Sequence, residues 1–141
     1  MRHDGAILAF RDLDALFRAR FEAIRAFERY SADNGTLVMK FFLNISKDEQ
    51  RKRFLKRIDR PDKNWKFSEG DLRERGFWDD YQQVYEDAIN ETAAPHAPWY
   101  VVPADDKKTM RLLVAQAVLA ALEEMDMAYP EVSAARRKGL Q

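Results

Sequence analysis

Two short apolar segments constrain the fold of this chain more than any other feature. TLVMKFFL spans residues 36–43, interrupted only by Lys40, and APWYVVPAD spans residues 97–105. Strands that are apolar on both faces are typical of a parallel sheet covered on both sides. Helical patterns separate the two segments, so the chain is predicted to be α/β with parallel strands. Two strands alone leave backbone groups unpaired, and we therefore expect this chain to be part of a larger fold.

Apolar periodicity and capping signals predict helices on both sides of the first strand. An amphipathic helix is expected over about residues 12–33. Gly35 follows it as a residue that accepts the left-handed conformation of a helix end. Ser46 and Glu49 match a capping box, which predicts that a second helix spans about residues 47–58.

Three further helices are predicted in the second half of the chain. Ser68 gives a weaker capping signal for a short helix. An aromatic stripe over residues 77–89 and an apolar face over residues 110–125 predict two longer helices, one on each side of the second strand. Residues 128–141 are expected to form a tail.

Positive and negative charges are segregated along the chain although the net charge is zero. Residues 51–66 carry eight bases against two acids, whereas residues 77–106 carry seven acids and no lysine or arginine. Such segregation produces a local electric field that the balanced total conceals. For a basic run taken alone, a solvated helix face is the favoured interpretation, so the pattern by itself does not establish what the cations face.

Composition excludes several classes of protein. The chain has no cysteine, so it has neither a disulfide framework nor a thiolate metal site. His3 and His96 are too isolated to suggest a zinc site. No apolar run is long enough to cross a membrane, and the amino terminus does not resemble a secretory signal. We expect a cytoplasmic protein that binds neither membranes nor nucleic acid.

Three segments carry a resemblance to a known family. FERYSADNGTLVMKFFLNISKDEQRKRF, DKNWKFSEGDLRERGFWDDYQQVYEDAI and HAPWYVVPADDKKTMRLLVAQAVLAAL occur in this order over about residues 12–125. They resemble the carboxy-terminal half of the family-2 polyphosphate kinases, most closely the branch of polyphosphate:nucleotide phosphotransferases. The resemblance implies part of a P-loop kinase fold similar to that of thymidylate kinases, with a helical lid over the phosphates.

The resemblance assigns expected roles along residues 1–141, with the lid at about residues 46–78. Arginine suits bidentate phosphate contacts, whereas lysine acts as a mobile point charge. The expected phosphate-binding residues of the lid are Arg53, Arg57, Arg60, Lys63 and Lys66. Arg53 and Arg57 lie four residues apart and therefore share one helix face. The remaining bases of the first lid helix, Arg51, Lys52 and Lys56, are expected to be solvated.

Acidic and aromatic residues near the lid have alternative roles. Asp105 and Asp106 follow the second strand and are expected to border the nucleotide, with one of them capping the next helix. Asp79 and Asp80 could hold magnesium, but ion pairs with lid bases are the favoured interpretation. Trp65 could stack on a base, although packing at the lid turn is favoured.

The chain departs from the family pattern in one important respect. The family has a glycine-rich Walker A loop with an essential lysine and a Walker B-type aspartate, and G-x-x-x-x-G-K-S/T does not occur here. No residue of this chain is therefore predicted to be catalytic or to bind metal, and Mg²⁺ is expected only in the complete enzyme. The expected partners are polyphosphate, nucleotide, and either further copies of the chain or a P-loop-bearing chain. The alternative is a non-catalytic remnant that binds polyanions or mediates oligomerisation.

Overall fold

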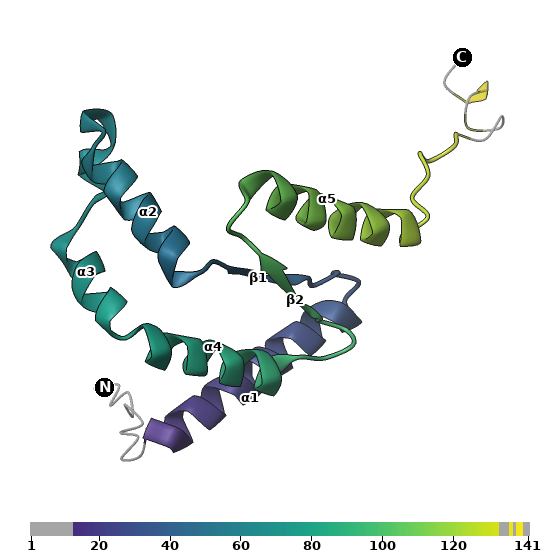
Figure 1. Ribbon diagram of the computed structural model, residues 1–141. Coiled ribbons are helices and arrows are strands. Elements are labelled where there is room, and N and C mark those ends of the chain that lie inside the picture. Colours follow the sequence, from purple (N-terminus) through teal and green to yellow (C-terminus); the bar gives the residue numbers. More distant parts are fainter. Residues whose placement is uncertain (1–12, 133–135, 137, 140–141) are drawn as a thin grey trace, which may run out of the picture.

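The computed structural model describes residues 13–132, 136, 138 and 139 and contains six helical segments and two strands in that range. In chain order the elements are α1 (Leu13–Asp33), β1 (Lys40–Asn44), α2 (Lys47–Ile58), the 3-10 helix η1 (Pro61–Lys66), α3 (Glu69–Gly76), α4 (Trp78–Thr92), β2 (Trp99–Pro103) and α5 (Lys107–Glu124). Figure 1 shows α2, α3 and α4 following one another in an arch, with α5 on the other side of the sheet from α1 and α4.

The predicted parallel pairing is confirmed. Lys40 pairs with Trp99, and the register continues in parallel to Asn44 and Pro103. The first strand is shorter than predicted, because residues 36–39 are not part of it. The backbone N–H of Lys40 donates to the carbonyl of Pro98, where the partner strand begins, so the earlier residues have no extended partner to pair with.

The helix ends follow the capping signals of the sequence. Gly35 has φ = +80° and ends α1 in the left-handed conformation that was predicted. The Ser46 hydroxyl accepts a hydrogen bond from the backbone N–H of Glu49 at 3.1 Å and caps α2. Ser68 caps the short α3 by accepting from the N–H of Gly70. The weaker capping signal at Ser68 therefore predicted this helix correctly. The 3-10 helix η1 was not predicted.

A buried ion pair connects α1, β1 and α4. The Lys40 Nζ donates to Glu28 Oε2 and to the carbonyl oxygen of Thr92, both at 2.7 Å. The side chains of Lys40 and Glu28 are only 12% and 8% exposed. Thr92 also accepts a hydrogen bond from the Trp99 indole through its hydroxyl, so the end of α4 is fixed to both strands.

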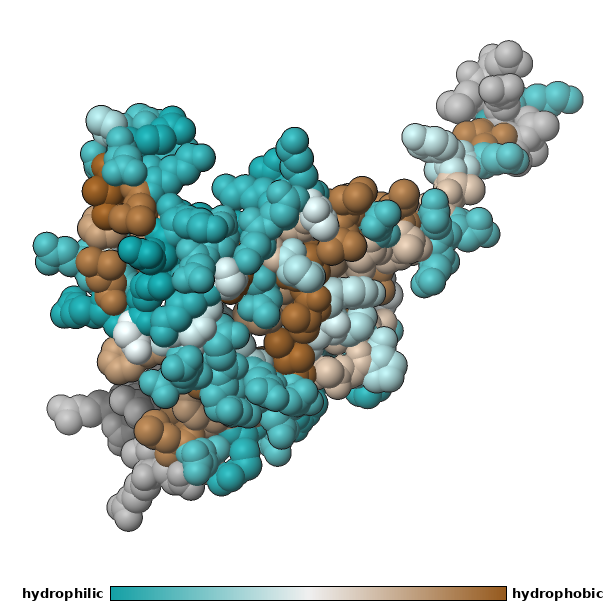
Figure 2. All heavy atoms as spheres, in the orientation of Figure 1, coloured by the Kyte–Doolittle hydropathy of each residue, from teal (hydrophilic) through white to brown (hydrophobic). Residues whose placement is uncertain are grey.

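The described part of the chain buries little apolar surface of its own. The buried apolar residues are Ala97, Val102 and Ala104. Large apolar side chains on the strands remain accessible, among them Leu43 and Val101. Figure 2 shows apolar surface over the sheet and α5. The described helices lie on both sides of the sheet, but they leave much of this apolar surface accessible.

We predict that Lys40→Met lowers the free energy of unfolding by about 3–5 kcal/mol, because the Glu28 carboxylate would remain buried without its cation. Urea unfolding followed by circular dichroism measures this change. Replacing both residues, as Lys40→Met with Glu28→Met, should recover much of the loss. Lys56→Met, on the exposed side of α2, serves as the control. If Lys40→Met and Lys56→Met had the same free energy of unfolding, the role assigned to the Lys40–Glu28 pair would be contradicted.

Candidate functional site

The loops after the two strands are joined at the carboxyl edge of the sheet. The backbone N–H of Ser46 donates to Asp105 Oδ1 at 2.7 Å, and the N–H of Ala104 donates to the carbonyl of Asn44 at 2.8 Å. These bonds fix the first turn of α2 against the turn that leads into α5. Ligands of open α/β folds bind at this edge, so the arrangement places the start of the predicted lid beside the predicted nucleotide edge.

Arg53 holds α2 against this edge. Its Nε donates to Glu49 Oε1 at 2.9 Å, and its Nη2 donates to the carbonyl of Ala104 at 2.6 Å. The guanidinium of Arg53 thus holds α2, the start of the predicted lid, against the loop after β2. Sequence reasoning assigned Arg53 only a phosphate contact. The bracing role could not be predicted, because its acceptor lies 51 residues further along the chain.

The other predicted lid cations lie in the last turn of α2, at the residue before η1 and on η1. The Arg57 guanidinium lies 5.5 Å from the centre of the Phe54 ring, and Lys66 Nζ lies 4.8 Å from the Trp65 ring. Arg60 forms an exposed ion pair with Asp62 at 2.8 Å. Lys63 is half-buried and forms no ion pair with a described residue. The four cations therefore lie between the last turn of α2 and the end of η1, and Figure 1 shows that this end of α2 points away from the sheet.

The two faces of α2 differ as predicted. Arg53 and Arg57 are half-buried, whereas Arg51, Lys52 and Lys56 are exposed. Because Arg53 and Arg57 lie four residues apart, they share the face of α2 that contacts the loop after β2 and the Phe54 ring. The other three bases lie on the solvated face.

Asn64 and Trp65 shape the turn after α2. Asn64 Nδ2 donates to the carbonyls of Arg57 and Ile58, which satisfies acceptors at the helix end. Trp65 Nε1 donates to the carbonyl of Asp62 at 3.1 Å, but the Trp65 residue is 77% exposed. Trp65 therefore braces the turn through its indole N–H, as predicted. Its ring is exposed, so the expectation that the ring packs at the turn was wrong. The sequence missed Asn64, although an Asn beyond a helix end is a known signal for such a bond.

Asp105 and Asp106 both act on backbone N–H groups. Asp106 caps α5, as its Oδ1 accepts from the N–H of Thr109 at 2.8 Å, which confirms that one of the two caps this helix. The hydrogen bond from the Thr109 backbone lowers the pKa of Asp106, and that from the Ser46 backbone lowers the pKa of Asp105. Both carboxylates are thus held in the charged form at the carboxyl edge of the sheet.

Asp79 and Asp80 do not form the ion pairs that the sequence favoured. Within the described residues, neither carboxylate contacts a lysine or arginine of the lid. Both lie in the first turn of α4, where negative side chains interact favourably with the positive end of the helix dipole. The helix therefore explains their position without a lid partner.

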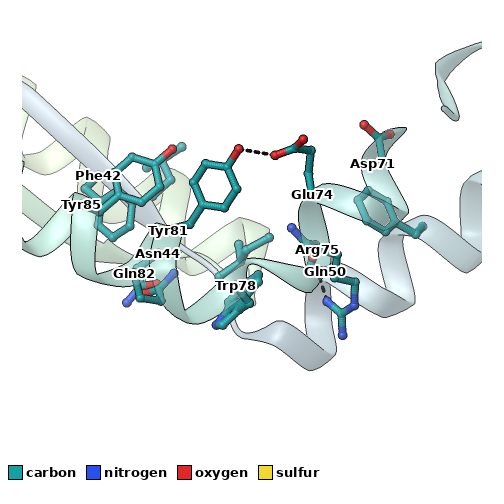
Figure 3. A pocket seen from close by; sticks show the side chains of 13 residues that line it. Phe42, Asn44, Gln50, Asp71, Glu74, Arg75, Trp78, Tyr81, Gln82 and Tyr85 are labelled. Atoms are coloured by element: carbon teal, nitrogen blue, oxygen red, sulfur yellow. Dashed lines mark hydrogen bonds between the residues drawn. The ribbon is translucent and has the colours of Figure 1, made fainter. Parts of the chain in front are cut away.

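The arch of α2, α3 and α4 encloses a pocket of about 320 Å³ beside the end of β1 (Figure 3). Arg75 lies in it and donates to the Lys47 carbonyl at 2.8 Å and to Gln50 Oε1 at 2.7 Å, which joins α3 to α2. The Tyr81 hydroxyl donates to Glu74 Oε2, and this bond raises the pKa of Tyr81. Sequence reasoning missed Arg75, because neither its spacing nor its neighbours in the chain reveal that three helices meet around it.

The described residues do not provide a metal site. No group of three or more acidic, histidine or cysteine side chains within them could hold an ion. His3 lies outside the described range, as does part of the predicted tail. No described helix is long and apolar enough to cross a membrane.

A parallel two-stranded sheet with helices on both sides, and a basic helical segment that begins at its carboxyl edge, is typical of a portion of an open α/β fold. The profile of the polyphosphate kinase 2 (PPK2) family matches residues 9–130. This chain belongs to the polyphosphate kinase 2 family. The fold class inferred from the resemblance is thereby confirmed.

Relatives and solved structures agree with this assignment. An ADP-polyphosphate phosphotransferase from Rhodopseudomonas palustris is 52% identical over 126 residues, which cover 89% of this chain and 44% of the relative. An AMP/ADP-polyphosphate phosphotransferase from Meiothermus ruber is 48% identical, with 87% and 46% covered. The crystal structure of polyphosphate kinase 2 from Arthrobacter aurescens superposes with a TM-score of 0.83 at 43% identity, over 89% of this chain and 45% of that one.

The matched region is less than half of these proteins. A further relative, an uncharacterized protein encoded in the chlN 3' region of Leptolyngbya boryana, is 49% identical, and there the match covers 86% of this chain and 89% of the relative.

We predict that the Asp106 cap makes α5 sensitive to acid. Because the folded pKa of Asp106 is lowered, its stabilisation is complete above the ordinary carboxyl pKa and is lost as the pH falls through the lowered value. Asp106→Ala should lower the melting temperature at pH 7, whereas Asp106→Asn should keep the cap and lose only the pH dependence. Thermal unfolding between pH 7 and pH 2 measures both effects. Unchanged melting of Asp106→Ala would contradict the cap.

Proposed function

We propose that this chain supplies the lid and the nucleotide edge of a polyphosphate-dependent nucleotide phosphotransferase, which moves phosphoryl groups between polyphosphate and nucleoside mono- or diphosphates. Family membership supports the reaction class. The observation that carries the proposal is the group of cations at the outer end of the lid, Arg57, Arg60, Lys63 and Lys66, most of them free of strong acidic partners.

The chemistry of phosphoryl transfer explains what such a lid contributes. The reaction depends on positioning and on stabilising negative charge, with little covalent work for the protein. Cations that close over the phosphates neutralise their repulsion and exclude water. In this proposal Arg57, Lys63 and Lys66 contact phosphate oxygens, and Arg53 holds the lid at its base while adding a contact as the lid closes. Asp105 and Asp106 fix the loop that borders the nucleotide.

The remaining catalytic groups would come from outside these 141 residues. The printed sequence lacks the Walker A pattern, and the described residues lack a cluster of metal ligands. Mg²⁺ and the β- and γ-phosphates would therefore be held by a P-loop segment that precedes this one or belongs to another chain. The accessible apolar surface of the sheet and α5 supports assembly with such a segment or with further copies of the chain.

A second candidate is a polyanion-binding or oligomerisation module without catalysis. The exposed cations and the lack of a Walker A pattern in the printed sequence favour it equally. The two candidates differ in whether a P-loop segment restores turnover.

We predict that the lid cations bind polyphosphate through position and not only through charge. Changing Arg57, Lys63 and Lys66 to Gln should weaken binding about tenfold or more, because hydrogen bonds to charged groups contribute about 1.5–3 kcal/mol each. Changing Arg51, Lys52 and Lys56 to Gln removes the same charge and the same residue types from the solvated face, and should weaken it little. Calorimetric titration with tripolyphosphate at several salt concentrations measures the difference. Equal losses would show that only bulk charge matters.

We further predict that the 141-residue chain does not phosphorylate AMP, ADP, GMP or GDP from polyphosphate and Mg²⁺. Adding a polypeptide that carries the Walker A lysine and Walker B aspartate should produce turnover, and Arg57→Gln in this chain should reduce it. A coupled ATP assay and chromatography of the products measure the reaction. Turnover by the chain alone that Arg57→Gln abolishes would contradict the prediction.

A further inference from the structure

The pocket within the arch of α2, α3 and α4 is lined by side chains that suit a flat aromatic ligand. It lies beside the carboxyl end of β1 and has a volume of about 320 Å³. Figure 3 shows aromatic side chains from β1 and α4 around it, and those that line it include Phe42, Trp78, Tyr81 and Tyr85. The rings of Phe42 and Tyr85 lie 4.7 Å apart and are tilted by 35°. Such walls favour a planar aromatic ligand.

Two amide side chains line the pocket without hydrogen-bond partners. Asn44 ends β1 and Gln82 lies on α4, and neither side chain bonds to any described residue. Each amide presents a donor and an acceptor next to each other. This pair matches the edge of a base on which a ring nitrogen adjoins an amino group, as in adenine.

The charges around the pocket disfavour phosphate inside it. Asp71 and Glu74 contribute two carboxylates, whereas Arg75 is the one cation in the lining and its Nη1 already bonds to Lys47 and Gln50. The uncharged part of a nucleotide therefore fits the interior better than its phosphates. Phe54 lines the same pocket, and the Arg57 guanidinium lies 5.5 Å from the centre of its ring. A cation of the lid thus stands beside one wall.

We propose that this pocket binds the base of the nucleotide, of the adenine type, with Asn44 and Gln82 reading its edge and Arg57 meeting its phosphates. This assignment rests on the proposed function. It places the base of the nucleotide in the pocket and its phosphates at Arg57. Stacking against the aromatic walls supplies attraction for any base, and the two amides supply the preference among bases.

Calorimetric titration of the full chain with AMP, and separately with ribose 5-phosphate, tests the assignment. AMP should bind about tenfold more tightly, because ribose 5-phosphate has the same phosphate and no base. Gln82→Met and Asn44→Leu, singly and together, should reduce this ratio toward one. Gln83→Met is the matched control, because the neighbouring Gln83 bonds to Asp87 outside the pocket and should leave the ratio unchanged.

The wild-type ratio decides the proposal even where a variant fails to fold. Equal affinity for AMP and ribose 5-phosphate, or no detectable binding of either by the folded chain, would overturn it. Equal effects of Gln82→Met and Gln83→Met would also overturn it. Tripolyphosphate binding tests the lid separately: if it depends on Arg57 while the base adds nothing, the proposed function stands and the base pocket is wrong.

Discussion

The buried contact of Lys40 with Glu28 and the Thr92 carbonyl underlies the rest of this structure. A charged lysine in an apolar strand would be strongly unfavourable alone, but here a carboxylate from α1 and a carbonyl at the end of α4 surround it at 2.7 Å. The contact fixes three elements that are distant in sequence. Because α4 ends there, the segment of α2, α3 and α4, which leaves the sheet at the carboxyl end of β1, returns to the sheet beside Lys40 at the opposite end of the strand.

The predicted lid is braced at its base, whereas its outer end has few polar contacts within the described residues. Arg53 and Ser46 bind the loop after β2, and Arg75 joins α3 to α2. Beyond these contacts, the side chains of Arg57, Lys63 and Lys66 form no hydrogen bond or ion pair with a described residue, and those of Arg57 and Lys66 lie over aromatic rings. In the proposed function, a braced base with cations at its outer end suits a part that meets polyphosphate. The same arrangement encloses the aromatic pocket, so phosphate and base contacts would come from one arch.

Much of the local structure could be predicted because it depends on neighbouring residues. The caps at Ser46 and Asp106 and the left-handed Gly35 arise from short-range hydrogen bonding and backbone sterics. Predictions that required a partner elsewhere were less successful. Residues 36–39 do not continue the first strand, Asp79 and Asp80 lack lid partners, and the Trp65 ring is exposed. In each case the sequence gives the side chain's preference but not what lies opposite it.

By itself the sequence determined the α/β class, the order of the elements and the segregation of charge. Three segments in the order of the family also carried the resemblance to the polyphosphate kinase 2 family. Only the tertiary structure decided which cations are committed to bracing and which remain available. It also decided that Arg75, Tyr81 and Gln82 meet Asn44 around one pocket. The physical reason is distance along the chain. Helix caps and periodicity act within a few residues, whereas the acceptor of Arg53 lies 51 residues away and becomes available only when the parallel strands pair.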